Sequence, residues 1–491
     1  MSLLAYLPIL TMLMPWREVP AGAHLEIRLT TAVGTYTSKV GTPVSAVLTT
    51  PLIADHEVLL PVGTSVTGEV KSVRRVGLGI VHETAAIEIE FNQATLPDQT
   101  TYPISARVIE VDNARERVDH AGRILAERAT SSVSNRAVGY VKLAVGLNIH
   151  AQLGMWAVKT LVSDVAEAEI CYPAGVDFTL ALTAPLTVAA RDEELGDVPR
   201  TTDSLTTDEL AALDEVVTGI PGRTENRSNH PSDLINVMFI GTRVQLEAAF
   251  VSAGWTQTPP STLRSHLRNI RAVMESQGNS TAPMSALLLA GEAPDMMWQK
   301  GLNDVGKRHH IRIWKRKETW NGEEIWVGAA THDINYAFLR PGMPVTHRIA
   351  EAIDRERDKV VHDLEFSSTV DLADWMDRTE FRHEMHNATG DAMSTDGRLA
   401  VVHLRTRPAA QFIVSFPDAP LPMHGRMLQR LARREILSLR NELLRDNSYW
   451  RSYEAIRFAV AAARHRKDTE VVAADVAPKG LEKISDFVAL R

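Results

Sequence analysis

The segment HHIRIWKRKETWNGEEIWVGAATHD, residues 309–333, decides how the second half of this chain folds. Its centre, Asn321-Gly322, is the strongest short signal for a β-hairpin, because both residues tolerate the positive φ angles of a type I′ turn. A turn of these two residues alone fixes the strand pairing: His310 faces Asp333, Arg312 faces Thr331 and Trp314 faces Ala329. A longer loop stays open as an alternative, because the surrounding TWNGEE is polar on both sides.

Alternation along the two strands gives this predicted hairpin one polar and one apolar face. The apolar face should cover a core, and it carries Ile311, Ile313, Trp326, Gly328 and Ala330. The polar face carries His310, Arg312, Trp314, Thr331 and Asp333. A slip of one residue would exchange the two faces.

The polar face groups side chains that can bind or react. A carboxylate at Asp333 beside His310 would orient the imidazole and raise its pKa. Arg312 could bind a phosphate or carboxylate group with two hydrogen bonds. The alternative is a His–Asp–Arg cluster that only satisfies a half-buried sheet face, and the segment offers no nucleophile to decide between them.

The bulk composition excludes some classes of protein. A chain of 491 residues predicts two to four domains, and 44% hydrophobic with 23% charged residues is typical of a soluble, core-forming protein. A net charge of −8 argues against nucleic-acid binding. The single Cys171 excludes an internal disulfide, which fits a reducing compartment or a periplasmic protein held together by its core.

Residues 1–18 contain the apolar stretch LLAYLPILTMLM, which is too short to span a bilayer. We interpret it as a clipped export signal or short anchor, or as a buried N-terminus. Residues 19–190 then predict an antiparallel β-barrel or sandwich, because AHLEIRL, VSAVLTT, SVTGEV and AIEIEF alternate between turn signals. VPAGAHLEIRLTTAV, from residue 19, and YPAGVDFTLALTAPL, from residue 172, echo each other, and the second should return the chain to the same sheet.

A helical insertion is predicted at about residues 121–168, between the two copies. Its apolar stretch VGYVKLAVGLNIHAQLGMWAVKTLV carries Lys142 and Lys159, which would each cost about 2.5–3.5 kcal/mol inside a membrane. Packing on the barrel or on a partner subunit is therefore favoured. With this insertion, residues 19–190 resemble the TrbI-type β-barrel of bacterial conjugation and secretion pores. The resemblance implies a secretion-associated barrel that can oligomerise.

The rest of the chain predicts a linker, an α+β domain and a helical tail. Residues 191–230 are acidic and Thr-rich, with a short helix near 207–217. Within 231–420, a buried strand at 234–240 precedes a helix that Thr242 and Gln245 begin with a capping box and Gly254 ends. A second helix is expected from about Ile349. The Arg-rich tail, residues 421–491, should pack on its own domain or lie on anionic lipid.

Three further residues surround the start of that second helix. Asp354 and Arg357 lie on one helical turn, and His347 could face an anion at the helix N-terminus. Each could equally be a solvated helix residue. The RHEMH segment lacks the spacing of a zinc-binding His-Glu-x-x-His motif, so no metal site is predicted. No P-loop, dinucleotide fingerprint or Gly-x-Ser-x-Gly motif is present, so no cofactor is predicted either.

Residues 231–420 resemble the LssY C-terminal domain, a bacterial family named for a protein linked to a type I secretion locus. The likeness rests on DLINVMFIG…GW, GEAPDMMWQK, HHIRIW, WVGAATHDI and THRIAEAIDRERDKVVHDL, whose polar residues recur at odd spacings. In some members the domain follows a membrane phosphatase-like or DedA-like segment. The resemblance implies one constellation, made of Asp233, Asn236, Asp295, Gln299, His310, Arg312, Trp314, Trp326, Gly328, Asp333, His347, Asp354 and Arg357.

Two functions of different classes fit a multidomain α+β protein of this kind. The first is a binding or scaffold protein of the cell envelope or periplasm, with a cytoplasmic location left open, that takes an anionic small molecule or an envelope or membrane protein partner. The second is a hydrolase of a phosphate-containing or lipid-linked substrate, with His310 and Asp333 as catalytic residues. In either case the expected ligand-binding residues are Arg312, Trp314, Asp295, Gln299, His347, Asp354 and Arg357.

Overall fold

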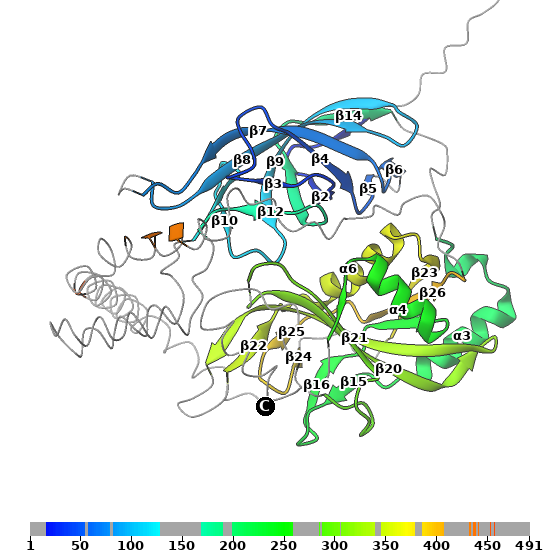
Figure 1. Ribbon diagram of the computed structural model, residues 1–491. Helices are drawn as coiled ribbons and strands as arrows, with labels where there is room; N and C mark the ends of the chain where they lie inside the picture. Colours follow the sequence, from blue (N-terminus) through cyan, green and yellow to red (C-terminus); the bar gives the residue numbers. More distant parts are fainter. Residues whose placement is uncertain are drawn as a thin grey trace, which may run out of the picture.

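The computed structural model shows a β-barrel unit packed on an α+β unit (Figure 1). It describes residues 16–54, 57–78, 82–127, 168–189, 199–258, 284, 287–304, 306–338, 345–378 and 385–406, with 432, 433, 436, 437, 440, 452 and 456 in the tail. The apolar N-terminal stretch and most of the predicted helical insertion lie outside these residues. Among the helices of the described part, none is long and apolar enough to cross a membrane.

The first unit is a closed antiparallel barrel of six strands, as the alternating segments predict. Closure follows because β8 pairs with both β7 and β9. The two echoing segments form β2 and β13, which pair with each other, so the second copy does return to the same sheet. Around the barrel the strands are β2 (His24–Leu29), β4 (Pro43–Leu48), β7 (Ser65–Arg74), β8 (Ala86–Thr95), β9 (Thr101–Val111) and β13 (Asp177–Leu182).

Shorter strands extend the barrel and close its ends. One of them corrects a prediction: β11 (Arg123–Leu125) pairs with β8, so strand occupies the expected start of the helical insertion. An alternating Arg-Ile-Leu stretch, whose Ile124 is buried, suits a sheet edge better than a helix. The other short strands are β1 (Trp16–Val19), β3 (Val33–Gly34), β5 (Leu52–Ala54), β6 (Glu57–Leu60), β10 (Arg117–Val118), β12 (Cys171–Tyr172) and β14 (Leu186–Ala189).

The second unit is built on one large mixed sheet, in the order β18-β19-β20-β21-β17-β26-β23, with β22 paired to β21. Only β17 and β26 run parallel among its described pairs. The strands are β17 (Val237–Ile240), β18 (Thr256–Gln257), β19 (Met296–Lys300), β20 (Arg308–Trp320), β21 (Glu323–Phe338), β22 (Val345–Ile349), β23 (Val370–Asp377) and β26 (Arg398–Leu404). Two small ladders accompany them: β15 (Arg223–Glu225) with β16 (Pro231–Leu234), and β24 (Met385–His386) with β25 (Ala392–Met393).

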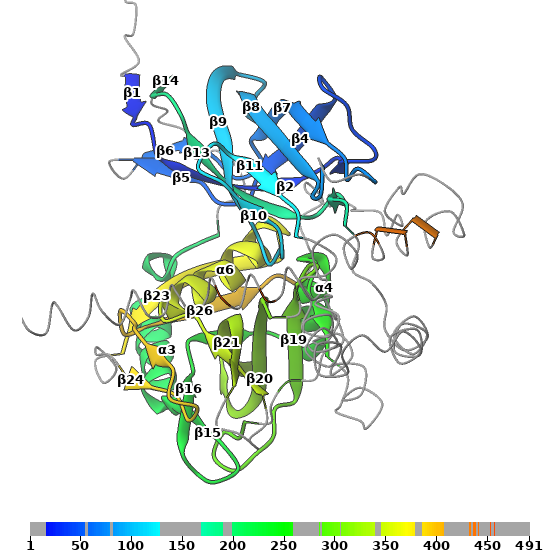
Figure 2. The ribbon, with the colours of Figure 1, turned by 90° about the vertical axis from the view of Figure 1, so that its left-hand side faces the viewer.

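Helices cover both faces of this sheet. The helices α4 (Arg243–Ser252) and α6 (Ile353–Phe366) bury Phe250 and Leu364 against one face, and α3 (Thr207–Gly219) buries Leu213 against the other. The predicted capping box of Thr242 and Gln245 is present, and a short 3₁₀ helix (Thr202–Ser204) precedes α3. Figure 2 shows α6 directly beneath the barrel.

Two predicted boundaries in this unit are wrong. The second helix begins at Ile353 rather than Ile349, because Val345–Ile349 pairs with β21 as strand β22. The expected single strand at 234–240 is broken between β16 and β17. At the break, the Asn236 side chain accepts from the Ala330 amide and donates to its carbonyl oxygen, each at 2.9 Å.

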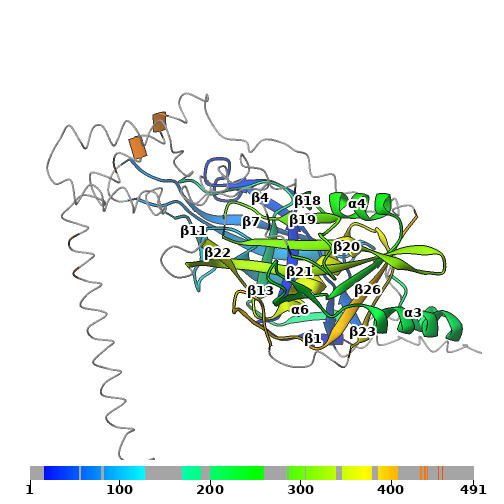
Figure 3. The ribbon, with the colours of Figure 1, turned by 90° about the horizontal axis from the view of Figure 1, so that it is seen from below.

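The central hairpin has the predicted turn, with φ of 50° at Asn321 and 83° at Gly322. Figure 3 shows its two long strands side by side, with the turn at the end nearer α3. The predicted register is wrong beyond the turn, because an irregularity between Lys315 and Thr319 moves the pairing by two residues. A shift of two preserves the faces. The observed pairs are His310 with Thr331, Arg312 with Ala329, Trp314 with Val327, and Arg308 with Asp333.

The two units meet through buried charges. Arg28 of the barrel donates to Asp177, also of the barrel, at 2.6 Å and to Asp363 of α6 at 2.7 Å. Lys300 and Lys359 bind the same two carboxylates from the α+β unit, at 3.0 to 3.6 Å. Three cations and two carboxylates therefore lie in one network across the contact.

The described tail residues are helical, and three of them contact the barrel unit. Leu437 is buried in the barrel's apolar core, and Arg433 donates to Glu169 at 3.0 Å. Arg440 donates to the carbonyl oxygen of Gly77. These three residues thus contact the first unit rather than the domain that precedes the tail, and the two arginines are paired instead of solvated.

Candidate functional site

Polar side chains converge at the open end of the hairpin, on the sheet face opposite α6. We call this group the Asp333 cluster, and its members come from β16, β19, β20, β21 and β22. Each is 6% exposed or less, except His347, whose side chain is 20% exposed and forms the edge toward solvent. The members are Asp233, Gln299, Arg308, His310, Arg312, Thr331, Asp333 and His347.

Asp333 is the centre of this cluster. Its Oδ2 accepts from Arg308 Nε at 2.7 Å, and the Nδ1 atoms of His347 and His310 lie 3.4 and 3.6 Å from the same oxygen. Burial alone would raise the pKa of Asp333, but the neighbouring histidines and Arg308 outweigh it and hold that pKa well below its usual range. Asp333 is therefore a carboxylate at every physiological pH.

His310 is a neutral imidazole, which corrects the predicted raised pKa. Burial lowers the pKa of His310 well below its usual value and outweighs the opposing charge of Asp333, and the positive charges of Arg312 and Arg308 lower it further. Its Nε2 atom lies 2.7 Å from the Thr331 hydroxyl oxygen. Its Nδ1 atom is buried and has no hydrogen-bond partner among the described residues.

Two arginines complete the cluster. Arg312 lies 3.2 Å from Asp233, and Arg308 also donates to the side-chain oxygen of Gln299 at 3.1 Å. Burial raises the pKa of Asp233, although the positive charge of Arg312 opposes this rise. Arg312 is thus paired with the weaker of the cluster's two acids.

Five of the nine site residues expected from the sequence meet in this cluster: His310, Asp333, Arg312, Gln299 and His347. The other four do not. Trp314 packs in the core under α3 and donates to the Glu292 carbonyl oxygen at 3.1 Å. Asp295 is exposed and accepts from the Lys315 amide at 2.8 Å.

Asp354 and Arg357 form a separate network at the start of α6. They lie 3.4 Å apart, as their spacing predicts, and Arg357 also donates to Asp396 at 2.7 Å. Two other members of the implied constellation have structural roles. Trp326 donates to the Gly241 carbonyl oxygen at 3.0 Å, and a Cβ at Gly328 would lie 2.7 Å from Ile311 Cδ1.

Sequence reasoning missed Arg308 and the bond between Thr331 and His310. The signal for Arg308 was present, because it continues the alternation His310, Arg312 by one step toward the N-terminus. Asp233 was implied only through the family resemblance, and its pairing with Arg312 joins segments far apart in sequence.

A second polar group lies on the opposite face, where the barrel meets the α+β unit. His309 lies between Asp112 of the barrel, 2.8 Å from its Nε2, and Glu356 of α6, 2.5 Å from its Nδ1. Burial lowers the pKa of His309, but the two carboxylates outweigh it and raise the pKa to about 10. The His332 ring stacks on the His309 ring with centroids 4.3 Å apart, and burial together with the charge of His309 lowers the pKa of His332 to about 4.

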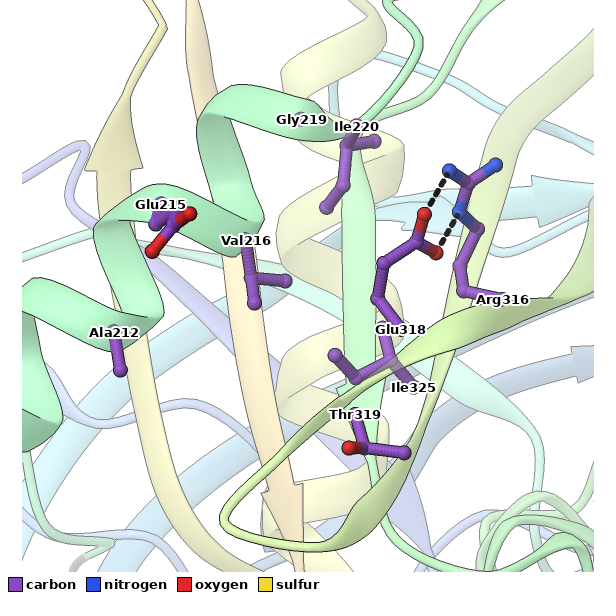
Figure 4. Close-up of a pocket in the computed structure, with 9 residues that line it drawn as sticks. All are labelled: Ala212, Glu215, Val216, Gly219, Ile220, Arg316, Glu318, Thr319 and Ile325. Atoms are coloured by element: carbon purple, nitrogen blue, oxygen red, sulfur yellow. Dashed lines mark hydrogen bonds and ion pairs between the residues drawn. The ribbon is translucent and has the colours of Figure 1, made fainter.

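A groove of about 410 Å³ lies at the other end of the hairpin, between its turn and α3 (Figure 4). The ion pair of Arg316 and Glu318 forms one side of it. The remaining lining residues are Ala212, Glu215, Val216, Gly219, Ile220, Thr319 and Ile325. The groove is thus separate from the Asp333 cluster.

The fold and the cluster describe a two-unit protein: a closed β-barrel joined to an α+β unit that holds a buried group of arginines, histidines and acids on its sheet. Residues 217–399 match the family model of the LssY C-terminus, which confirms the resemblance seen in the sequence. The match begins at residue 217, earlier than the expected start at about 231, and so includes the end of α3. It ends at residue 399, earlier than the expected end at about 420.

Two further comparisons add little. The structure of ComB10 of the Com type IV secretion system of Helicobacter pylori matches at 10% identity, covering 34% of this chain and 89% of that chain, with a TM-score of 0.20. At this TM-score the likeness carries no argument, so the TrbI-type resemblance stays a prediction. No curated protein matches the chain.

Proposed function

We propose that this chain is an envelope-associated binding protein whose LssY-type unit holds a small anionic ligand, carrying a phosphate or carboxylate group, at the Asp333 cluster. The observation that carries the proposal is the convergence of two buried guanidinium groups and two imidazoles on one end of the sheet. Arginine is suited to such ligands, because its fixed donors match the oxygens of a phosphate or carboxylate.

The charges of the cluster favour an added anion. Arg308 is neutralised by Asp333, whereas the partner of Arg312 is Asp233, a carboxyl group whose pKa is raised. The pKa of His347 is lowered by burial and by Arg308 and Arg312, despite the nearby Asp333. An anion at the solvent edge would reverse part of this effect, so that His347 takes up a proton as the anion binds.

The neutral His310 favours binding over proton transfer. A general base works best with a pKa near the working pH. The pKa of His310 lies well below that range, but a neutral imidazole with a free Nδ1 can form a hydrogen bond to a ligand. The envelope location, a protein partner and oligomerisation through the barrel are further parts of this proposal, and the LssY family match and the TrbI-type sequence resemblance support them.

Calorimetry on the full chain in the presence of EDTA tests the ligand site. Inorganic phosphate should bind, and His347→Gln should weaken binding at least threefold at pH 5.5, while His403→Gln should not change it. His403 is a matched control, because it lies on β26 of the same sheet, away from the cluster, with 17% side-chain exposure. Absence of phosphate binding to the wild-type protein at 10 mM (on the order of the weakest affinities worth testing), or equal binding by the two variants, would overturn the proposal.

A pH series with sulfate separates proton uptake by the protein from titration of the ligand, because sulfate keeps its charge between pH 5.5 and 7.5. Sulfate binding should tighten as the pH falls through this range, and His347→Gln should remove most of the change. The location has its own test: the tagged native protein should fractionate with the envelope. Recovery of all of it as a soluble cytosolic monomer would contradict that part.

A hydrolase is the second candidate, and one contact favours it. The Thr331 hydroxyl oxygen lies 2.7 Å from His310 Nε2, with Asp333 behind the ring, which is the order of groups in a nucleophile–base–acid arrangement. Thr331 would give its proton to His310 and attack phosphorus; the P–O bond to the leaving group would break, and His310 would pass the proton to that oxygen, which leaves as an alcohol. Water would then cleave the bond between Thr331 and phosphorus, which frees the phosphate and restores the hydroxyl group. Turnover of p-nitrophenyl phosphate should vanish in Thr331→Val and in Arg312→Ala; unchanged turnover in both variants, or none in the wild type, excludes this candidate.

A further inference from the structure

The contact between the barrel and the α+β unit brings together donors that suit a transition metal. Asp112 and Asn113 directly follow barrel strand β9, His309 and His332 face each other on β20 and β21, and Glu356 extends from α6. We call these five residues the interface site. They come from segments about 200 residues apart, so no sequence spacing could reveal them.

The side chains converge on one small volume. His309 Nε2 lies 2.8 and 2.9 Å from the two Asp112 oxygens, and His332 Nε2 lies 2.9 Å from the Asn113 side-chain oxygen. The two rings are stacked at an interplanar angle of 26°, so both Nε2 atoms are directed toward the same barrel loop. One ligand atom from each of Asp112, His309 and His332 lies within 4.8 Å of the others.

We propose that Asp112, His309 and His332 bind a divalent transition-metal ion of the Zn²⁺ class. Two imidazoles and one carboxylate form the donor set that Zn²⁺ prefers, whereas Mg²⁺ and Ca²⁺ prefer oxygen ligands alone. Donor atoms of a tetrahedral zinc site lie about 3.4 Å apart. Side-chain movements of about 1 Å would therefore close the site around an ion. The ion would lie between His309 and Asp112, in place of their present hydrogen bond.

Glu356 fits the same proposal as an orienting residue. Metal-binding histidines commonly donate their other ring nitrogen to a carboxylate, and His309 Nδ1 lies 2.5 Å from Glu356 Oε2. The other oxygen, Oε1, is buried and has no hydrogen-bond partner in the described part of the chain. Glu356 lies on the far side of the imidazole from the Nε2 atom that would hold the ion, so it orients His309 and does not bind the metal.

Neighbouring charges and exposure allow an ion to enter. The Lys359 ammonium group lies 3.7 Å from an Asp112 oxygen, but it is closer to Asp177, at 3.1 Å. When Asp112 binds a metal, Lys359 can therefore remain paired with Asp177. The Asp112 side chain is 23% exposed, whereas that of His309 is 4% exposed. The ion would join one ligand of the barrel to two of the α+β unit, and thus fasten the two units together.

The full-length protein, stripped with EDTA and dialysed, tests this proposal with Zn²⁺ and Co²⁺ alone. We expect one equivalent of Zn²⁺ to bind and raise the unfolding temperature, and Co²⁺ to give the visible absorption of a tetrahedral site. Asp112→Asn and His332→Gln should each weaken Zn²⁺ binding at least tenfold, while His403→Gln and Asp119→Asn keep wild-type affinity.

Two outcomes would overturn the site. One is stripped wild-type protein that binds neither ion. The other is Zn²⁺ binding of equal affinity in the wild type and in Asp112→Asn, which would place the ion elsewhere. His332→Gln guards against misfolding, because the His332 side chain is half-buried and hydrogen-bonds to Asn113, so the folded state should survive its loss; circular dichroism verifies this.

Discussion

Replacing Arg28 with alanine should destabilise the contact between the barrel and the α+β unit by about 3 kcal/mol. Arg28 is 2% exposed and bonds to both Asp177 and Asp363. Removal of one partner from a buried ion pair costs about 3–5 kcal/mol, because the remaining charge stays buried. The lower end applies here, since Lys300 and Lys359 still bind the two carboxylates.

Urea unfolding followed by tryptophan fluorescence measures this loss, and Trp255, one of nine tryptophans, lies at the contact and donates to Asp363 at 2.9 Å. Arg17→Ala is the matched control. Arg17 also binds a carboxylate at 2.9 Å, but the side chains of that pair are 34% and 37% exposed, so solvent screens it and its loss should cost far less. If Arg28→Ala and Arg17→Ala differ by less than 1 kcal/mol (on the order of one exposed pair), the buried network does not hold the units together.

Three other variants test the packing and the charges. In Gly68→Ala the new Cβ would lie 2.1 Å from the Glu90 carbonyl oxygen, so the barrel should lose about 2–3 kcal/mol by urea unfolding, while Gly219→Ala, with open space around it, should lose none. Thr242→Ala removes the α4 capping box and should lower thermal stability by about 1 kcal/mol, and no change would count against the cap. Burial, with a contribution from Asp358, raises the pKa of Glu365 to about 7, above its unfolded value of 4.5, so its ionisation should cost stability as the pH rises from about 4.5 through 7. Glu365→Gln should therefore gain about 1–3 kcal/mol over the wild type at pH 8 but little at pH 4, and equal gains at both values would refute the assignment.

Local signals in the sequence predicted local structure well. The Asn-Gly turn, the capping box at Thr242 and the pairing of the two echoing strands all depend on residues close in sequence or on repeated patterns, and the structure has each of them. The family match depends on several polar residues in order, and it too is confirmed.

The register of the hairpin failed for a physical reason. The residues between Lys315 and Thr319 are polar and largely exposed, so neither face has a hydrophobic preference that would fix the pairing there. The faces were still correct, because Ile311 and Ile313 must be buried. The pKa of His310 was wrong because its complete burial, which is the main cause of the lowered pKa, could not be read from the strand pattern, and because Arg312 and Arg308 add to that lowering.

Contacts between distant segments could not be read from the chain. Neither the pairing of Arg312 with Asp233 nor the approach of Asp112 to His309 follows from any spacing or alternation. These contacts depend on how complete sheets pack together, and a single sequence without related sequences carries no direct sign of that.

Helix α6 belongs to both halves of the molecule at once. Its Val360 and Leu364 complete the core of the sheet, while Asp363 and Glu356 meet the barrel side. Without the barrel, Glu356 would keep His309 and Asp363 would keep Lys300 and Lys359, but Asp363 would lose Arg28. Relatives that carry the LssY-type half without this barrel should therefore replace Asp363 more readily than Glu356, whose partner His309 lies in the same half.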